Sequence, residues 1–526
     1  MVSMKTQPML NERSLRIAIV VSTAVVVAVL AAAFVANAMT KDVGRDEQMY
    51  CTAGVLLGRG HLIYRDFTYP SQLPCHPLLL AGLYRVMGTS RFLLIGRLVS
   101  VICDILVMLG IVGIFRFVFG SSRRAGWFFG MAAVAFYAFN PLVDYAAGYA
   151  WNHDVVILCV VASLWLFITT DFGHKSRYWR AALMGAALTL ATCMRITTAL
   201  IELVFLAALL YASGPSFRQK SRTALPFSAA GLIVLAWPVW IVAQAPRAFW
   251  INLIEIPALY GRWLHDIGMT HNKVALTLTA LSLPGYLALL AVAGGLAWVL
   301  CRRFARLDTQ VKPKALLTAL LPVAFFVIAY IPPTMWRQYL AVPVPFLTVA
   351  FAYPLAELYK QARTGAGKRS FLVASYGVGI GAAVAVLSYP VVLDRLPLVL
   401  VPERWTPVEL HKRSVAIGND VQEPRLVCTL GPLEALEGGC DIYPELACGS
   451  IVYRVADLMS SQQREATHAT GATTLAGLLE QRPPSAVMVG VEPSHFSFLE
   501  EPLRNCVPVD WQRLTYDNGL QVYFRP

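Results

Sequence analysis

Two adjacent carboxylates, Asp46 and Glu47, follow the first hydrophobic segment of the chain. They begin the stretch "DEQMYCTAGVLLGRG", which reads as a helix, and a carboxylate at a membrane surface can act as a general base. The simpler interpretation is that both acids cap this helix, because carboxylates stabilise the positive end of a helix dipole. The pair belongs to a loop of about fifty residues, and long ordered loops in compact folds are often functional. Capping and chemistry are therefore both open on residue type alone.

The elements that must position these acids are membrane-spanning helices. Hydrophobic residues make up 57% of the 526-residue chain and charged residues only 14%, whereas soluble domains carry about 25% charged residues. Apolar runs of about 20 residues match the bilayer core, and spanning backbone must satisfy its own hydrogen bonds. We therefore expect a polytopic α-helical membrane protein with about eleven spans, near residues 15–38, 92–115, 125–143, 153–170, 180–194, 196–213, 223–245, 275–300, 315–331, 338–358 and 370–392.

The loops between these spans predict an orientation. Arg and Lys gather in every second loop, and the short loops between them carry almost none, which is the positive-inside pattern of a multi-pass protein of the inner or plasma membrane. The N-terminus is then cytoplasmic, and an odd number of spans places the C-terminus outside. The "VANA" at the end of segment 15–38 is similar to a signal-peptide cleavage site, but the apolar run is longer than a usual signal sequence, so an uncleaved span is favoured. The net charge of +13 is spread over separate loops, so it indicates contact with the lipid bilayer and not with nucleic acid.

The last 130 or so residues have a different composition. "RLVCTL" and "SAVMVGV" read as strands, "TTLAGLLEQRPP" as a helix, and "RLTYDNGLQVYF" as a hairpin with Asn-Gly at its turn. We therefore expect a membrane domain over residues 1–393, with its first external loop at 39–91, and a small extracytoplasmic α/β domain over residues 394–526.

The cysteines leave the disulfides undecided. An oxidising exterior permits disulfides, and the pairs Cys51–Cys75 and Cys440–Cys448 are close enough in sequence to form them. Each pair is as well explained by free thiols. No array of Cys and His suggests a structural zinc site.

The first external loop carries a series of short motifs in a fixed order. Asp46 and Glu47 are followed by Tyr50, then by "YRDF" at 64–67, by prolines at 74 and 77, and by "GRL" at 96–98. This order resembles the first external loop of GT-C glycosyltransferases of the protein O-mannosyltransferase and aminoarabinose-transferase kind. The likeness is best over the first hundred residues, and "NP…GYAWNHD" and "RQYLAVPVP" extend it to about residue 355.

The resemblance implies a GT-C-like fold and a specific chemistry. Such an enzyme takes a sugar from a polyprenyl-phosphate donor and passes it to an extracytoplasmic acceptor, which can be a glycan, a lipid or a protein. Asp46 would be the general base of a single displacement with inversion, and Glu47 would orient Asp46, the acceptor or a metal. A divalent metal is left open as a cofactor, and no Gly-rich phosphate loop suggests nucleotide binding.

Substrate-binding residues are expected at the external ends of the spans. A lipid-phosphate leaving group needs positive charge nearby, although a basic side chain at a span end often only reaches to the interface. The aromatic candidates fit an interfacial belt equally well, and the acid and histidine of "NHD" can simply cap their helix. The full set is Tyr50, Tyr64, Arg65, His153, Asp154, Arg195, Lys273 and Arg337.

Two other classes of function compete with the enzyme. A lipid or sugar transporter would explain the spans, but it usually shows paired hydropathy repeats with broken helices, and no such symmetry is visible. A non-catalytic assembly protein of the cell envelope would use the C-terminal residues as an interaction module. The adjacent acids in the long first loop favour the enzyme.

Overall fold

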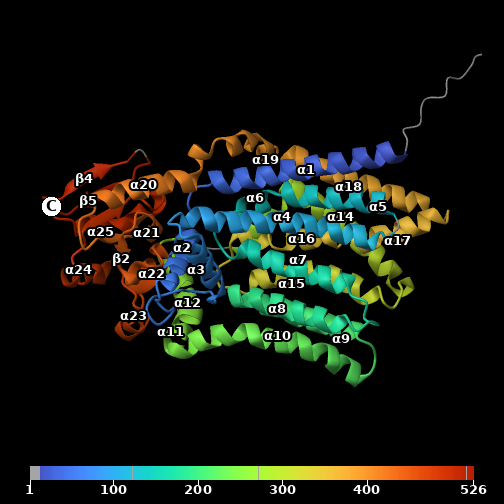
Figure 1. Cartoon of the computed structure of the whole chain (residues 1–526), viewed down its shortest axis with the longest axis horizontal. Helices are drawn as coiled ribbons and strands as arrows, with labels where there is room; N and C mark the ends of the chain where they lie inside the picture. Colours follow the sequence, from blue (N-terminus) through green and yellow to red (C-terminus); the bar gives the residue numbers. More distant parts are fainter. Residues whose placement is uncertain (1–11, 121, 270–271, 366, 517) are drawn as a thin grey trace, which may run out of the picture.

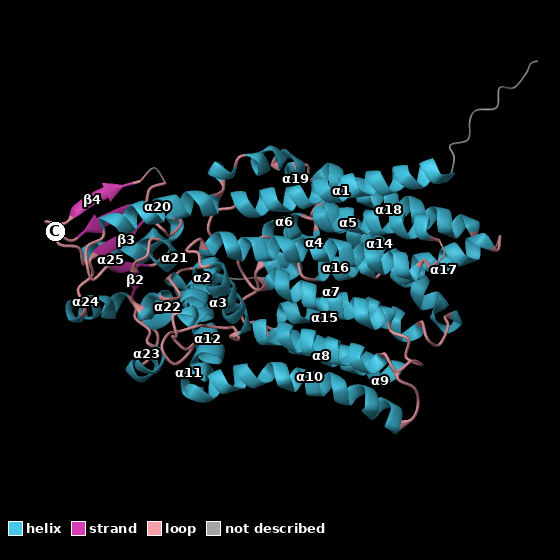
Figure 2. Ribbon diagram, viewed as in Figure 1, coloured by secondary structure: helices cyan, strands magenta, loops and turns pink. Residues whose placement is uncertain are grey.

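The computed structural model describes residues 12–120, 122–269, 272–365, 367–516 and 518–526. A bundle of long helices forms the larger part, and the C-terminal part, residues 394–526, lies at one end of it with all the strands of the described chain (Figures 1 and 2). Short helices fill the space between the two parts. The functional site is built from these short helices.

Helical structure occupies each of the eleven apolar windows expected from the sequence. Two windows are interrupted, since 273–303 breaks at Ser282 and 337–363 is three short helices. The elements are α1 (Glu12–Thr40), α4 (Phe92–Val118), α5 (Arg123–Ala138), α7 (His153–Thr169), α8 (Arg177–Met194), η1 (Ile196–Thr198) with α9 (Ala199–Ala212), α10 (Phe217–Gln244), α13 (Lys273–Leu281) with α14 (Pro284–Arg303) and η3 (Phe304–Arg306), α15 (Lys312–Tyr330), η4 (Arg337–Leu340) with α16 (Pro343–Val349) and α17 (Ala352–Arg363), and α18 (Lys368–Ser388).

Length and composition qualify fewer of these helices as complete spans. Within the described residues, six helices are long and apolar enough to cross a membrane, and a seventh is reached if α1 and the helix after it count as one bent span. Four of the expected windows do not qualify. α5, α7 and α9 have 16, 17 and 14 residues, which falls short of the roughly 20 that a bilayer requires, and α8 has 18 residues and begins with the polar stretch "RYWR".

Close helix contacts in the bundle depend on glycine. α8 and α10 pack against each other most extensively, and a Cβ added to Gly185 of α8 would lie 2.0 Å from the carbonyl oxygen of Phe227 in α10. No side chain fits there, so the backbones meet directly, as small residues allow in membrane helices.

Short helices form the layer between the bundle and the C-terminal part (Figure 1). The first of them, α2, follows α1 after a break of four residues and turns from the axis of α1 by 87°. It packs along α3. The layer consists of α2 (Arg45–Gly58), α3 (Cys75–Met87), α6 (Pro141–Ala146), α11 (Pro246–Trp250), the π-helix η2 (Ile251–Glu255) and α12 (Ile256–Asp266).

The C-terminal part contains a five-stranded sheet in the order β2-β1-β3-β5-β4. The first three strands are parallel, and β5 and β4 are antiparallel additions. The sequence correctly predicts the strands β1 and β3, the helix α24 and the hairpin β4–β5. The elements are α19 (Val391–Asp394), η5 (Leu396–Leu400), η6 (Pro402–Arg404), α20 (Thr406–Asp420), β1 (Leu426–Thr429), α21 (Pro432–Glu437), β2 (Asp441–Ile442), η7 (Pro444–Leu446), α22 (Ser450–Ala456), α23 (Ser461–Thr467), α24 (Ala472–Gln481), β3 (Ala486–Val489), η8 (Ser494–Glu500), α25 (Glu501–Asn505), β4 (Gln512–Thr515) and β5 (Gln521–Phe524).

Polar contacts dock the C-terminal part onto α2 and its neighbours. The amide of Leu433 donates to the Gln48 side chain at 3.0 Å, and Arg59 forms an ion pair with Asp441 at 2.9 Å. Both Gln48 and Arg59 come from α2 or its C-terminal end. The sheet is therefore attached to the same helix that carries Asp46.

Neither of the disulfides considered from the sequence is present. All ten cysteines lie within the described residues and are free thiols. The Cys448 thiol donates to the Thr68 carbonyl at 2.9 Å, and Cys51 lies against the Tyr84 hydroxyl. Cys75 lies against Cys193 of α8. Each of these thiols faces a partner other than its neighbour in sequence.

Candidate active site

Glu47 is fixed inside the protein by Arg97 of α4. Both side chains are fully buried, and the guanidinium of Arg97 donates to the two carboxylate oxygens at 2.9 and 2.7 Å. The backbone amides of Gly44 and Ala150 donate to the same two oxygens at 2.8 and 2.6 Å. The bond from Gly44 is the capping contact of α2, in which the third helical residue reaches back to the residue before the helix. For Glu47, the structure therefore favours the capping interpretation.

A close backbone approach makes this arrangement fit. A Cβ added to Gly96, next to Arg97, would lie 2.5 Å from Cβ of Ala150. Glycine at position 96 thus lets the loop that carries Ala150 reach Glu47. The remaining donors of Arg97 bond to the carbonyls of Ala38, Lys41 and Asp42, where α1 ends. Arg97 therefore joins α1, α2 and α4.

Asp46 precedes Glu47 and lies on a different side of α2, because successive helical residues are about 100° apart. Its side chain is partly exposed. Burial raises the pKa of its carboxyl group, and the positive charges of Arg454, Arg45 and, more weakly, Arg195 act in the opposite direction. Asp46 is thus a partly exposed carboxylate on which arginines from three parts of the chain act.

Arg454 of α22 reaches this site from the C-terminal part. The helix α22 packs against both α2 and α12. The Arg454 guanidinium donates to the Tyr260 hydroxyl at 2.7 Å and to Ser450, and it lies 5.0 Å from the ring centre of Trp263. Phe496 closes the aromatic surround at 5.6 Å. Among the described residues, no carboxylate lies within ion-pair distance of Arg454, so its charge acts on Asp46 without direct neutralisation.

Arg45 has a different role from that of Arg454. It forms an ion pair with the buried Glu492 at 2.7 Å and lies 4.4 Å from the ring centre of Phe496. Its charge is therefore partly neutralised by the C-terminal part. The ion pair also attaches the first turn of α2 to the residues after β3.

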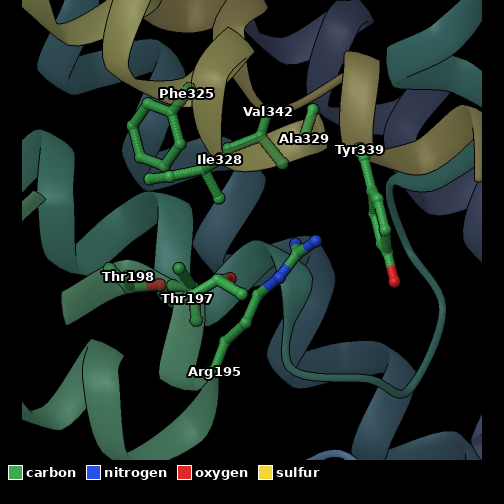
Figure 3. Close-up of a pocket in the computed structure, with 9 residues that line it drawn as sticks. Arg195, Thr197, Thr198, Phe325, Ile328, Ala329, Tyr339 and Val342 are labelled. Atoms are coloured by element: carbon green, nitrogen blue, oxygen red, sulfur yellow. The ribbon is translucent and has the colours of Figure 1, made fainter. Parts of the chain in front are cut away.

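Arg195 reaches the site from the bundle. It stands between α8 and η1, and its guanidinium lies 4.7 Å from the ring centre of Tyr339 in η4. Figure 3 shows the Arg195 side chain extending into a small cavity bounded by Thr197, Ile328 and Tyr339. At the N-terminal end of η4, the ring of Trp336 lies 6.2 Å from that of Tyr260. Helix η4 therefore connects the surroundings of Arg195 with those of Arg454.

Tyr50 lies one turn along α2 from Asp46. It is buried, and its ring packs edge-on against Tyr69 and His76. Burial and the negative charge of Asp46 raise the pKa of Tyr50, and Arg195 opposes this shift. The structure thus brings Tyr50, Asp46 and Arg195 together.

His153 and Asp154 are buried at the start of α7. Asp154 accepts a hydrogen bond from the Gly148 amide at 3.0 Å, and the His153 ring packs against Trp151 at 5.8 Å. Arg195 is close enough for its charge to act on His153. Asp154 holds the loop before its own helix, which agrees with the structural alternative for this pair.

The other expected substrate-binding residues have partners elsewhere. The Tyr64 hydroxyl donates to the Gln72 carbonyl at 2.5 Å inside the first loop, and Arg65 forms an exposed ion pair with Asp66. Lys273 donates to the carbonyls of residues 330 and 332 after α15. Arg337 is exposed on η4, and both it and Asp46 are close enough to Tyr145 for their charges to act on that residue. Of these four residues, Arg337 is the one placed at the rim of the site.

Sequence reasoning missed Arg45, Arg97, Tyr339 and Arg454. Arg97 stood in the quoted "GRL" motif and Tyr339 in "RQYLAVPVP", so both lay inside recognised segments without a role. Arg454 lies outside the motifs that carry the resemblance and about 400 positions from Asp46, so only the fold brings the two together. Arg45 adjoins Asp46 and was overlooked in favour of the acids.

The residues around Asp46 do not form a metal site by themselves. Within the described residues, no group of three or more His, Cys, Asp or Glu side chains could hold a metal ion. Glu47, which the resemblance would let orient Asp46, the acceptor or a metal, has both oxygens in hydrogen bonds to Arg97 and to backbone amides. The geometry therefore assigns Glu47 to the protein framework.

Known proteins match the chain in two ways. The family model for dolichyl-phosphate-mannose-protein mannosyltransferase matches residues 70–242. The solved structures that resemble the chain include ArnT from Cupriavidus metallidurans bound to undecaprenyl phosphate, with 14% identity, a TM-score of 0.60 and coverage of 96% of this chain and 97% of that chain. The same protein in the apo state gives 13% identity, a TM-score of 0.61 and 98% coverage of both chains. No curated protein matches the sequence significantly.

The likeness to ArnT extends over nearly the whole of both chains, so it includes the C-terminal part as well as the bundle. It confirms the fold that the first external loop predicts. The family match over residues 70–242 agrees with the expected glycosyl transfer. These findings identify the chain as a multi-pass membrane protein of the GT-C glycosyltransferase fold.

Proposed function

We propose that the protein transfers a sugar from a polyprenyl-phosphate donor to an extracytoplasmic acceptor, with inversion and with Asp46 as the general base. The observation that carries the proposal is the environment of Asp46, a partly exposed carboxylate next to the cations Arg454, Arg45 and Arg195. The ArnT structure that holds undecaprenyl phosphate has the same fold, which supports a polyprenyl phosphate as the carrier.

In the proposed reaction, Asp46 accepts the proton of the acceptor hydroxyl while the acceptor oxygen attacks the anomeric carbon. The bond from that carbon to the phosphate oxygen breaks, and the lipid phosphate leaves with the electron pair. A base must be ionised to act, and the three arginines favour the ionised form of Asp46 against the effect of burial. Glu47 does not exchange protons in this scheme, because Arg97 holds it as an ion pair.

Arg195 is the proposed partner of the donor phosphate. It borders a cavity at the external end of the bundle and is supported by the face of Tyr339. A guanidinium in this position would stabilise the charge that develops on the leaving phosphate. Tyr50 lies between Arg195 and Asp46 in this scheme, and Arg337 stands at the rim.

Arg454 is the proposed contribution of the C-terminal part. Ser450 and Tyr260 fix its guanidinium, so its charge is pre-positioned and not provided by a mobile surface side chain. The C-terminal part would then complete the active site, and its removal would change the ionisation of Asp46 as well as the stability of the protein.

The proposed orientation places the N-terminus in the cytoplasm and the C-terminal part outside. Its support is the distribution of basic residues. Helix α17 lies at the end of the bundle opposite the C-terminal part (Figure 1), and its last turn carries Lys360 and Arg363, as the positive-inside rule requires. A reporter fused after Pro526 that is active only in the cytoplasm would contradict this orientation.

The direct test measures sugar transfer in membranes that contain defined polyprenyl-phosphate sugars. We expect the wild-type protein to release polyprenyl phosphate and to glycosylate an acceptor presented from the C-terminal side. For variants of Arg454, Arg482→Met is a suitable control. Arg482 belongs to the same part of the chain as Arg454 and also lies beside an aromatic ring, that of Tyr443, whereas the arginines that act on Asp46 are Arg454, Arg45 and Arg195. A protein that moves the lipid-linked sugar across the membrane and leaves it intact would be a transporter, and the proposal would be wrong.

A further inference from the structure

A groove far from the proposed active site runs between α5 and α18. Its volume is about 660 Å³, which falls in the size range of small-molecule sites. The two helices pack against each other, and α17 adjoins α18 at the end opposite the C-terminal part (Figure 1). The lining residues are Arg124, Ala125, Phe128, Phe129, Tyr359, Phe371, Leu372, Ser375, Tyr376, Gly379, Ile380 and Ala383.

The walls of the groove are apolar and face outward from the bundle. Phe128, Tyr376 and Ile380 are 57%, 68% and 63% exposed. On a membrane protein of this fold, such a surface lies against lipid tails and not against water. The backbone of Gly379 adds depth, because a Cβ placed there would meet no atom within 4 Å.

The same groove has a strongly basic mouth. Arg124 lines it, and Arg123 begins the same helix. Lys368 and Arg369 occupy the first turn of α18 and are exposed. The first turns of α5 and α18 contain no acidic residue.

These cationic side chains lie at the N-termini of their helices, where a positive charge lowers helix stability. The N-terminus of a helix carries a partial positive charge, which favours anions and disfavours Lys and Arg. Two such N-termini meet here, each with two cationic side chains. An anion between them would be stabilised by the side-chain charges and by both dipoles.

We infer that the groove between α5 and α18 binds an anionic diacyl phospholipid of the bilayer, with its phosphate at Arg124 and the first turns of the two helices and an acyl chain along Phe128, Tyr376 and Ile380. The combination of an apolar channel with a basic mouth fits this ligand, since basic pockets between membrane helices recognise anionic head groups. A helix from a second copy of the chain would cover the apolar walls alone, and the test below includes it as an outcome.

The test uses the purified full-length protein in detergent, stripped of lipid and titrated with dioleoyl phosphatidylglycerol or with dioleoyl phosphatidylcholine, with bound lipid counted by native mass spectrometry. We expect tighter binding of phosphatidylglycerol. Gly379→Trp should abolish this binding by filling the groove. Gly377→Trp is the matched control, because Gly377 lies on the same helix, also has no atom within 4 Å of an added Cβ, and does not line the groove.

A second pair of variants tests the basic mouth without changing its packing. Arg124→Gln should weaken the binding of phosphatidylglycerol about fivefold, the equivalent of about 1 kcal/mol for one basic side chain at a membrane surface. Arg218→Gln, at the exposed start of α10, should have no effect.

Three results would overturn the inference. Equal affinity for the two lipids would exclude a head-group site at the basic mouth. Equal losses of lipid binding in Gly379→Trp and Gly377→Trp would exclude the groove as the place where the lipid binds. A wild-type dimer that Gly379→Trp converts to a monomer would show that a second copy of the chain is the occupant.

Discussion

Replacing Glu47 separates a structural role from a catalytic one. Glu47→Gln keeps the size of the side chain but turns a carboxylate into an amide opposite Arg97. The amide keeps one oxygen, so only one of the two bonds from the guanidinium at 2.9 and 2.7 Å can remain, and it then goes to a neutral acceptor. The nitrogen that replaces the other oxygen is a donor and cannot accept from Gly44 or Ala150. Both partners are fully buried.

The size of the effect follows from that burial. Breaking a buried ion pair by removing one partner costs about 3–5 kcal/mol, because the remaining charge is left in a medium of low polarity. Carbonyls of residues 38, 41 and 42 still accept from Arg97, so we expect the lower half of this range. A loss of about 3 kcal/mol is a large share of the roughly 5–15 kcal/mol that stabilises a typical protein.

The assay is thermal unfolding of the purified protein in detergent, followed by intrinsic fluorescence or by aggregation. Arg59→Met is the matched control. In its ion pair the side chains of Arg59 and Asp441 are 39% and 69% exposed, and exposed pairs of this kind contribute about 0–1 kcal/mol to the stability. We expect Glu47→Gln to melt well below Arg59→Met. A variant that melts with the control and loses only activity would refute the structural assignment of Glu47.

Two further predictions concern the site, and a third concerns the cysteines. Arg454→Met removes the strongest of the positive charges that lower the pKa of Asp46, so this pKa should rise further. Because the base works deprotonated, the acidic limb of the pH–rate profile should move to higher pH. Arg454→Lys and Arg482→Met should leave that limb nearer the wild-type position. Arg195→Met should raise KM for the polyprenyl-phosphate sugar about tenfold to a hundredfold, the value of one charged hydrogen bond, and an unchanged KM would remove Arg195 from the phosphate site. Thiol labelling of the denatured, unreduced protein should modify all ten cysteines, and protection of any pair would reveal a disulfide.

The sequence predicts the bundle because apolar runs and breakers are local signals. Each apolar window contains helix, and the hairpin at residues 512–524 follows its Asn-Gly turn. The number of spans is less predictable, because the 17-residue α7 is close to the length that a bilayer requires, and whether such a helix crosses then depends also on its neighbours.

The candidate site, like the bundle, was predictable from the sequence only in part. Asp46 and Tyr50 could be selected because they are four residues apart in a motif. The different roles of Asp46 and Glu47 could not be read from adjacent acids, since the distinction depends on Arg97, about fifty positions away, and on the close approach of Ala150. Arg65 looked suitable by position, but its neighbour Asp66 already neutralises it.

The central claim is that Asp46 is the base of a glycosyl transfer, and one variant tests it most directly. Asp46→Asn keeps the shape of the side chain and an oxygen near the start of α2, and it removes the basicity. We expect sugar transfer from a polyprenyl-phosphate donor to fall at least about a hundredfold, the lower range of general-base contributions, in membranes with matched protein levels and with thermal stability close to that of the wild type. Transfer at the wild-type rate by Asp46→Asn would contradict the account.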